Sequence, residues 1–121
     1  MEKLTTKEEA IMLILWRLGN AFVKDIIREM DEPKPHYNTV STTVRILEDK
    51  GFIGHESFGN THRYYPQVSE DRYKRHFVSG IVDNYFNRSF KNMVTFFAEK
   101  EHLSKKDLED ILRMIENEDD E

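Results

Sequence analysis

The spacing of apolar residues changes at Gly51, and this change constrains the fold more than any other feature of the sequence. Before Gly51, apolar residues recur at helical spacing in three segments. After it, Phe52–Phe58 and Thr61–Tyr65 read as two strands around the dipeptide Gly59-Asn60, whose residues both tolerate the positive φ of a tight turn. Pro66 ends the pairing. The sequence therefore predicts a β-hairpin directly after three helices.

Local signals place the first two helices. Thr5 and Glu8 have the spacing of a capping box, apolar residues follow with helical period, and Gly19 is a natural stop. A short second helix is marked by Val23, Ile26, Ile27 and Met30. Its start is weakly signalled because Phe22 stands where a hydroxyl cap is expected, and Pro33 and Pro35 break it.

The third helix is predicted from about Tyr37 to Lys50 and has two contrasting faces. Val40, Val44 and Leu47 fall within about 60° of each other and must pack inward. The opposite face carries Asn38, Thr42, Arg45 and Asp49, with Ser41 on its flank. Small polar residues are unusual on a merely solvated helix, where Glu and Lys are the better helix formers.

The C-terminal half reads as helical throughout. Ser69-Glu70-Asp71 opens a long fourth helix, and a kink or break is predicted near Gly80 or around Asn87–Ser89. Its apolar stripe comprises Tyr73, Phe77, Ile81, Tyr85, Phe86, Phe90, Met93, Val94 and Phe97. A last helix begins after Ser104, and Glu116–Glu121 is expected to fray.

These elements predict a mainly α protein with a small β-wing. Residues 1–68 form a winged helix-turn-helix domain, and residues 69–121 form a C-terminal helical dimerisation domain. The apolar stripe exceeds what a domain of this size covers, so we expect burial against a second copy in a homodimer. The interface is predicted to comprise Tyr73, Phe77, Ile81, Phe86, Phe90, Phe97, Leu108, Ile111, Leu112 and Ile115.

In a winged helix-turn-helix the third helix enters the major groove of double-stranded DNA, and residues near its N-terminus read the bases. Here these are Asn38, Ser41, Thr42 and Arg45, whereas phosphate contacts are predicted for Thr39, Lys50, His62 and Arg63. A winged helix used only for protein contacts is the alternative. The polar, hydroxyl-rich face argues against it, because a protein-binding face usually exposes aliphatic or aromatic residues.

Charge permits DNA binding without arguing for it. The net charge is −5, but the segment from Glu99 onward carries −6, which leaves +1 for the 98 residues before it. The chain has no cysteine, and no metal-binding spacing, nucleophile motif or phosphate loop is present, so we expect no metal, no cofactor and no enzyme. No apolar run is long enough to insert into a bilayer, and we expect a cytoplasmic protein.

Four segments resemble the penicillinase and methicillin-resistance repressors. They are Glu9–Trp16, Tyr37–Ile53, Arg63–Pro66, and Phe97–Glu101 with Leu103-Ser104. The resemblance spans nearly the whole chain. It implies a homodimer that binds a DNA operator through an N-terminal winged domain and represses an adjacent operon. It also implies a partner, either a membrane-bound sensor metallopeptidase or a protease that this sensor activates.

In that family, induction follows proteolytic cutting within the dimerisation domain. The corresponding bond here is Phe96–Phe97, with Phe96 in place of the family's Asn. A family arginine of the recognition helix appears as Ile46, so the family's operator sequence does not carry over. The paired C-terminal cysteines of the copper-responsive members are absent.

A ligand-sensing regulator of the same fold is the second functional hypothesis. Its effector would bind between the two domains in a pocket lined by Trp16, Tyr64, Tyr65 and Tyr73, and would release the protein from DNA without cleavage.

Overall fold

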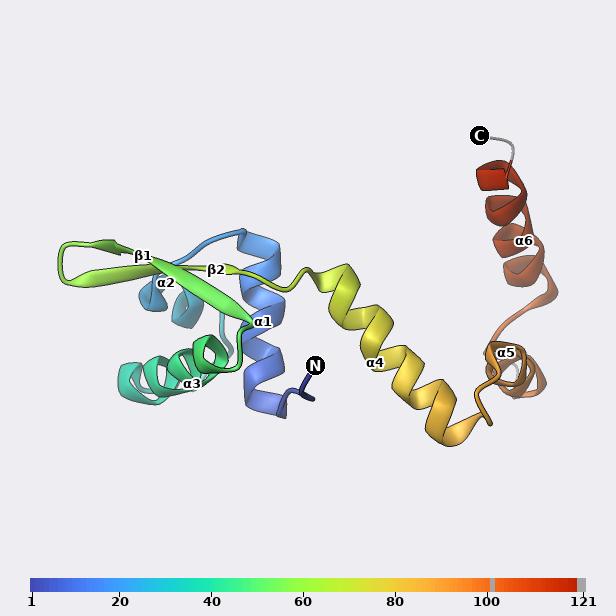
Figure 1. Cartoon of the computed structure of the whole chain (residues 1–121), viewed down its shortest axis with the longest axis horizontal. Coiled ribbons are helices and arrows are strands. Elements are labelled where there is room, and N and C mark those ends of the chain that lie inside the picture. Colours follow the sequence, from blue (N-terminus) through green and yellow to red (C-terminus); the bar gives the residue numbers. More distant parts are fainter. Residues whose placement is uncertain (101, 120–121) are drawn as a thin grey trace. The chain divides into compact units, whose positions relative to one another are not determined.

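A computed structural model of the chain describes residues 1–100 and 102–119. Its elements in chain order are α1 (Thr6–Leu18), α2 (Val23–Arg28), α3 (Tyr37–Asp49), β1 (Ile53–Phe58), β2 (Thr61–Pro66), α4 (Glu70–Tyr85), α5 (Phe90–Glu99) and α6 (Lys105–Asp119) (Figure 1). The predicted mainly α fold with one β-hairpin is confirmed. The chain divides into two compact units, Met1–Phe77 and Val78–Glu121, called unit one and unit two below.

The caps of α1 form as the sequence predicts. The backbone N–H of Glu8 donates to Oγ1 of Thr5 (3.2 Å), and the N–H of Thr5 donates to Oε1 of Glu8 (2.8 Å). Gly19 closes the helix at φ 85°. At α2 no side chain takes the place of the missing hydroxyl cap, but the other half of a capping box forms, because Oδ2 of Asp25 accepts from the backbone N–H of Phe22 (2.9 Å).

The core of unit one draws on every element of that unit. The inward face predicted for α3 is confirmed, since Val40, Val44 and Leu47 are all buried. They pack in one cluster with residues from the other elements, among them Ile11, Met12, Leu15, Ile26, Phe52 and Ile53. An antiparallel bridge between Ala21 and Tyr64 joins the α1–α2 loop to β2, so the hairpin is fixed at its base to the helices.

The register of the hairpin decides which side chains share a face. Phe58 pairs with Thr61 across the two-residue turn, with Gly59 at φ 62°. Because side chains alternate along a strand, His62 and Tyr64 lie on the face of His55, whereas Arg63 lies on the other face with Glu56. We call this hairpin the wing.

The first half of α4 belongs to unit one. Tyr73 is buried, with its ring centroid 5.7 Å from that of Trp16 and 6.0 Å from that of Phe52. The indole N–H of Trp16 donates to the carbonyl of Val68 (2.8 Å), just before the helix. The prediction of Tyr73 as a dimer contact is therefore wrong, because the core of its own unit covers its ring. Unit one also takes in residues 69–77, which the predicted boundary assigned to the second domain.

The predicted long fourth helix is broken at the place where the sequence weakens it. α4 ends at Tyr85, and Asn87 (φ 51°) and Arg88 (φ 60°) turn the chain. Ser89 then caps α5 by accepting from the N–H of Asn92 (3.1 Å). Two helices therefore replace one.

The last helix follows its predicted cap. Ser104 and Asp107 each accept from the other's backbone N–H at the start of α6. The helix continues to Asp119, so Glu116 to Asp119 are helical where fraying was predicted. Glu101, Asp120 and Glu121 lie outside the described residues.

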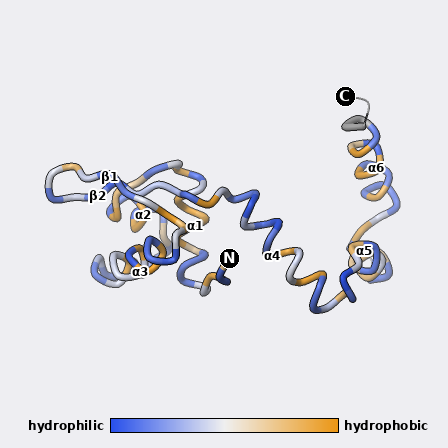
Figure 2. The backbone as a smooth tube through the Cα atoms, viewed as in Figure 1, coloured by the Kyte–Doolittle hydropathy of each residue, from blue (hydrophilic) through white to orange (hydrophobic). Residues whose placement is uncertain are grey.

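Unit two buries very little of its apolar surface within one chain. Among its side chains of described burial, Val82 alone is a buried hydrophobic residue. Figure 2 shows apolar residues recurring along α5 and α6. The exposed large ones in this unit are Tyr85, Phe90, Val94, Phe96, Phe97, Ile111, Leu112, Met114 and Ile115.

Candidate nucleic-acid interface

The outward face of α3 carries most of the residues predicted to contact DNA. Asn38, Thr39, Thr42 and Arg45 are all exposed on this helix. The hydroxyl of Thr42 donates to the carbonyl oxygen of Asn38 (2.8 Å), one turn back along the helix. That hydrogen is thus already used, and Thr42 presents a methyl group and an acceptor rather than a donor.

Ser41 does not share this face. It is 9% exposed and lies on the flank of α3 beside a cavity. The prediction that it reads bases is corrected for this reason, since the neighbouring elements cover its side chain.

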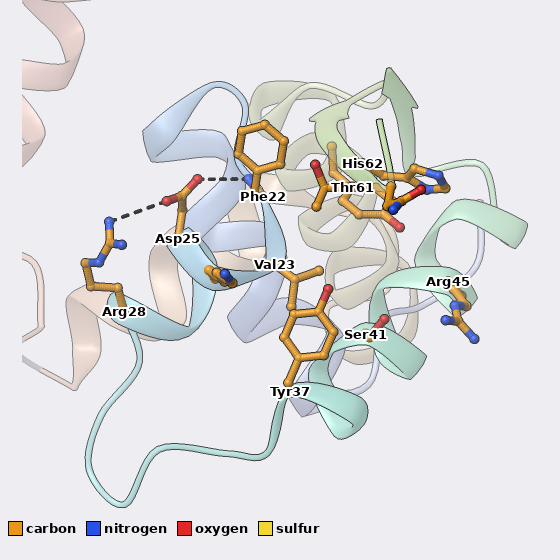
Figure 3. Close-up of a pocket in the computed structure, with 12 residues that line it drawn as sticks. Phe22, Val23, Asp25, Arg28, Tyr37, Ser41, Arg45, Thr61 and His62 are labelled. Atoms are coloured by element: carbon orange, nitrogen blue, oxygen red, sulfur yellow. Dashed lines mark hydrogen bonds and ion pairs between the residues drawn. The ribbon is translucent and has the colours of Figure 1, made fainter. Parts of the chain in front are cut away.

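The cavity lies between α2, α3 and the wing and has a volume of about 400 Å³ (Figure 3). Its lining comprises Phe22, Val23, Lys24, Asp25, Arg28, Tyr37, Ser41, Arg45, Asn60, Thr61, His62 and Tyr64. The lining has three cationic side chains, those of Lys24, Arg28 and Arg45, and one carboxylate, that of Asp25. Nη1 of Arg28 lies 3.4 Å from Oδ1 of Asp25 and forms an ion pair with it. Lys24 and Arg45 therefore give the cavity a positive edge beside the outward face of α3.

His62 is held at this cavity through two further residues. Its ring stacks on that of His55 with centroids 4.1 Å apart and planes 4° apart. Nδ1 of His55 lies 2.5 Å from Oε2 of Glu48, so a carboxylate of α3 anchors the wing. Tyr64 lies beside both imidazoles; burial raises the pKa of its phenol, and the Glu48 carboxylate adds to that shift. The phenol stays neutral near pH 7.

Arg63 faces away from this arrangement. Its guanidinium group lies 3.3 Å from Oε2 of Glu56 and 4.7 Å from the ring centroid of Phe58, on the opposite face of the wing. The sequence predicted phosphate contacts for both His62 and Arg63, but only His62 shares the face that meets α3.

Lys50 is engaged inside the domain. Its Nζ atom lies 2.9 Å from Oε1 of the buried Glu8 and 3.9 Å from Oε2 of Glu2. Its side chain is 23% exposed. The prediction of Lys50 as a phosphate contact is corrected to a structural role, because its ammonium group already compensates a buried carboxylate.

The aromatic residues suggested for an effector pocket do not gather around one cavity. Trp16 and Tyr73 contact each other in the core of unit one, whereas Tyr64 lines the cavity beside α3. Tyr65 lies on the opposite face of the wing, next to Gly54. The geometry therefore gives no support to an effector site built from these four side chains.

Three packed helices, the third with a polar outward face, and a hairpin anchored to that third helix define a winged-helix protein. More particularly, the chain belongs to the penicillinase repressor family, whose family model matches residues 4–117. This is a family of transcriptional repressors and not of enzymes. The family therefore confirms two predictions from the sequence, that the protein is a repressor and that it is not an enzyme.

Individual relatives agree with this assignment. The chain is similar to the methicillin resistance regulatory protein MecI of Staphylococcus aureus (strain N315), with 26% identity over 114 residues, 93% of each protein. It is 21% identical to the penicillinase repressor of Bacillus licheniformis over 94% of this chain and 90% of that protein. The solution structure of the DNA-binding domain of the repressor BlaI matches with TM-score 0.52 and 23% identity, over 60% of this chain and 94% of that one, which confirms the winged-helix fold of the part that it covers.

Two negative findings apply to the part of the chain that the structure describes. No helix there is long and apolar enough to cross a membrane. No group of three or more potential metal ligands comes together within the same residues.

Proposed function

We propose that this repressor is a homodimer that binds a palindromic operator in double-stranded DNA, with α3 in the major groove. The single observation that carries the proposal is the outward face of α3, where Asn38, Thr42 and Arg45 are exposed next to the cation-edged cavity. Among the relatives, MecI is named a regulatory protein of methicillin resistance, and BlaI a repressor with a DNA-binding domain.

The contacts divide between reading and positioning. Asn38 and Arg45 are the base readers, since Asn pairs with adenine and Arg with guanine through two hydrogen bonds each. Thr39 on the flank of α3 away from the cavity, and Lys24 and His62 at the cavity, contact phosphates. These phosphate contacts set the register of α3 on the duplex without choosing its sequence.

Unit two supports the homodimer. A helical unit with one buried hydrophobic residue among its described side chains has almost no core of its own. A second copy would cover the exposed rows of α5 and α6, including Phe90, Phe97, Ile111, Leu112 and Ile115. A two-fold axis then places two α3 helices in successive major grooves, with half-sites about 10 base pairs, or a multiple, apart.

Relief of repression is proposed to follow cleavage of the Phe96–Phe97 bond. Both side chains are exposed, but the bond lies inside α5, so a protease must first unwind that helix to present an extended backbone. Cleavage separates α6 from α5 and removes apolar area from the dimer, and DNA affinity falls as two linked binding domains become single ones. A membrane-bound sensor metallopeptidase, or a protease that it activates in the cytoplasm, is the proposed partner.

The proposal is tested by selecting duplexes from a random-sequence pool with the purified chain and measuring its mass by light scattering. We expect an enriched two-fold-symmetric sequence and a dimer at micromolar concentration. If no sequence is enriched, the proposed operator binding is wrong. If the chain is a monomer by light scattering, the proposed homodimer is wrong. For the cleavage step, an uncut and fully active repressor in induced cells contradicts the proposed relief.

A further inference from the structure

Ile46 is the exception to the way α3 distributes its aliphatic residues. Val40, Val44 and Leu47 are buried, whereas Ile46 is 42% exposed. At about 100° per residue, Ile46 lies roughly 40° from Thr42 and 20° from Thr39 around the helix. It therefore stands on the Thr39 flank of the outward face, about 80° around the helix from Asn38, where a solvated helix usually has a polar residue.

The threonines beside Ile46 make this part of the helix face more apolar than their hydroxyl groups would lead one to expect. Thr42 donates its hydroxyl hydrogen to Asn38 O (2.8 Å), and Thr43 donates to Thr39 O (3.1 Å). With both donors satisfied inside the helix, these two side chains contribute methyl groups around Ile46. The result is an apolar strip on a helix face that otherwise offers Asn38 and Arg45.

One base edge in the major groove matches such a strip. Thymine alone carries a methyl group there, while the other bases present only hydrogen-bond donors and acceptors. Resting on the proposed function, we propose that Ile46, with the methyl group of Thr42, contacts the C5-methyl group of a thymine in each half-site. Ile46 is then a specificity-determining residue of this repressor.

The helix geometry also places this thymine relative to the adenine read by Asn38. Eight residues separate Asn38 from Ile46, about 12 Å along the helix axis. Base pairs repeat about every 3.4 Å. The thymine should thus lie about two to four base pairs from that adenine, on the side of the C-terminal half of α3.

The experiment uses the duplex selected by the wild-type chain, resynthesised with deoxyuridine in place of one thymine at a time. Deoxyuridine keeps the base pair and removes only the methyl group. In the wild type we expect about a fourfold loss of affinity at one thymine per half-site, the size expected for one buried methyl group. Ile46→Ala should lose most of this discrimination, because only the methyl group of Thr42 is left to contact the thymine, and Ile46→Val should discriminate to an intermediate degree.

Leu13→Ala is the matched control, because Leu13 is an aliphatic residue 50% exposed on α1 and outside the interface. It should keep the full discrimination. An equal uracil effect in the wild type and Ile46→Ala, or no uracil effect at any thymine in the wild type, overturns the inference and leaves the proposed function standing. If the wild type enriches no duplex, the proposed function fails and this inference fails with it.

Discussion

The Nζ atom of Lys50 lies 2.9 Å from Oε1 of Glu8, and this ion pair joins the end of α3 to the first turn of α1. Glu8 is only 3% exposed and also accepts from the backbone N–H of Thr5. A single carboxylate thus caps one helix and fixes the end of the proposed DNA-reading helix.

Replacement of Lys50 by alanine tests whether this residue stabilises the fold or contacts DNA. Lys50→Ala leaves the buried Glu8 carboxylate without its cation, and we expect a loss of about 1–3 kcal/mol in the free energy of unfolding. Urea denaturation measures it. The slope of log affinity against log salt for random DNA should stay unchanged. A flatter slope with unchanged stability restores Lys50 as a phosphate contact.

The same pair predicts an acid-sensitive contribution to stability. Burial by itself raises the pKa of Glu8, but the N–H of Thr5 and the ammonium of Lys50 outweigh it, so the pKa is lowered from its usual 4.5. A carboxylate with a lowered folded pKa stabilises the fold fully above the unfolded value, and this contribution is lost as the pH falls through the folded pKa. Glu8→Gln keeps a residue suited to the capping box but cannot ionise. The difference in unfolding free energy between wild type and Glu8→Gln should therefore shrink from neutral pH to below 4.5; a constant difference contradicts this.

Arg45 and Lys24 are expected to act differently on DNA. Arg45→Ala should cost about 1–3 kcal/mol of specific binding and relax the preference at one base position. Lys24→Ala should weaken binding to all sequences and lower the salt slope by about one. Competition titrations with the selected and with random duplexes separate the two effects. Lys74→Ala on α4 is the control, and equal losses on both duplexes for Arg45→Ala would assign Arg45 to a phosphate.

The exposed apolar residues of unit two predict that one charged side chain introduced among them dissociates the dimer. Leu112 is 55% exposed on α6, so Leu112→Glu should leave the single chain folded while placing a carboxylate in the proposed interface. We expect a monomer by light scattering and a loss of operator affinity of about 100-fold, as two linked contacts become one. Leu13→Glu on α1 is the control and should remain dimeric. A Leu112→Glu dimer with unchanged affinity argues against this surface.

Local sequence signals predicted the elements well because each depends on residues close in the chain. The capping box of Thr5 and Glu8, the inward face of α3 and the turn at Gly59 all form as expected. A kink or break was predicted near Gly80 or around Asn87–Ser89, and the chain turns at the second of these places. The cap of α2 by Asp25 was missed, although an acid three residues after the cap position is a signal that can reveal it.

The partners of individual side chains were less predictable because they come from distant parts of the chain. His62 was predicted as a site residue, but its stack on His55 and the anchor of that ring to Glu48 depend on how the wing packs against α3. From the sequence, Ile46 was noted only as a departure from the repressor family that the chain resembles. Its exposure on α3, seen only in the structure, supports the proposed contact with thymine.

The sequence by itself determined the order of elements, the mainly α class with its wing, and the identity of α3 as the proposed reading helix. Helical period, caps and turns are properties of neighbouring residues, so no tertiary contact is needed to see them. Only the tertiary structure decided that Ser41 is covered on the flank of α3, that Lys50 compensates Glu8, and that Tyr73 belongs to the core of unit one. A residue's position around its helix fixes its direction, but the elements packed beside it decide whether its side chain remains free for DNA.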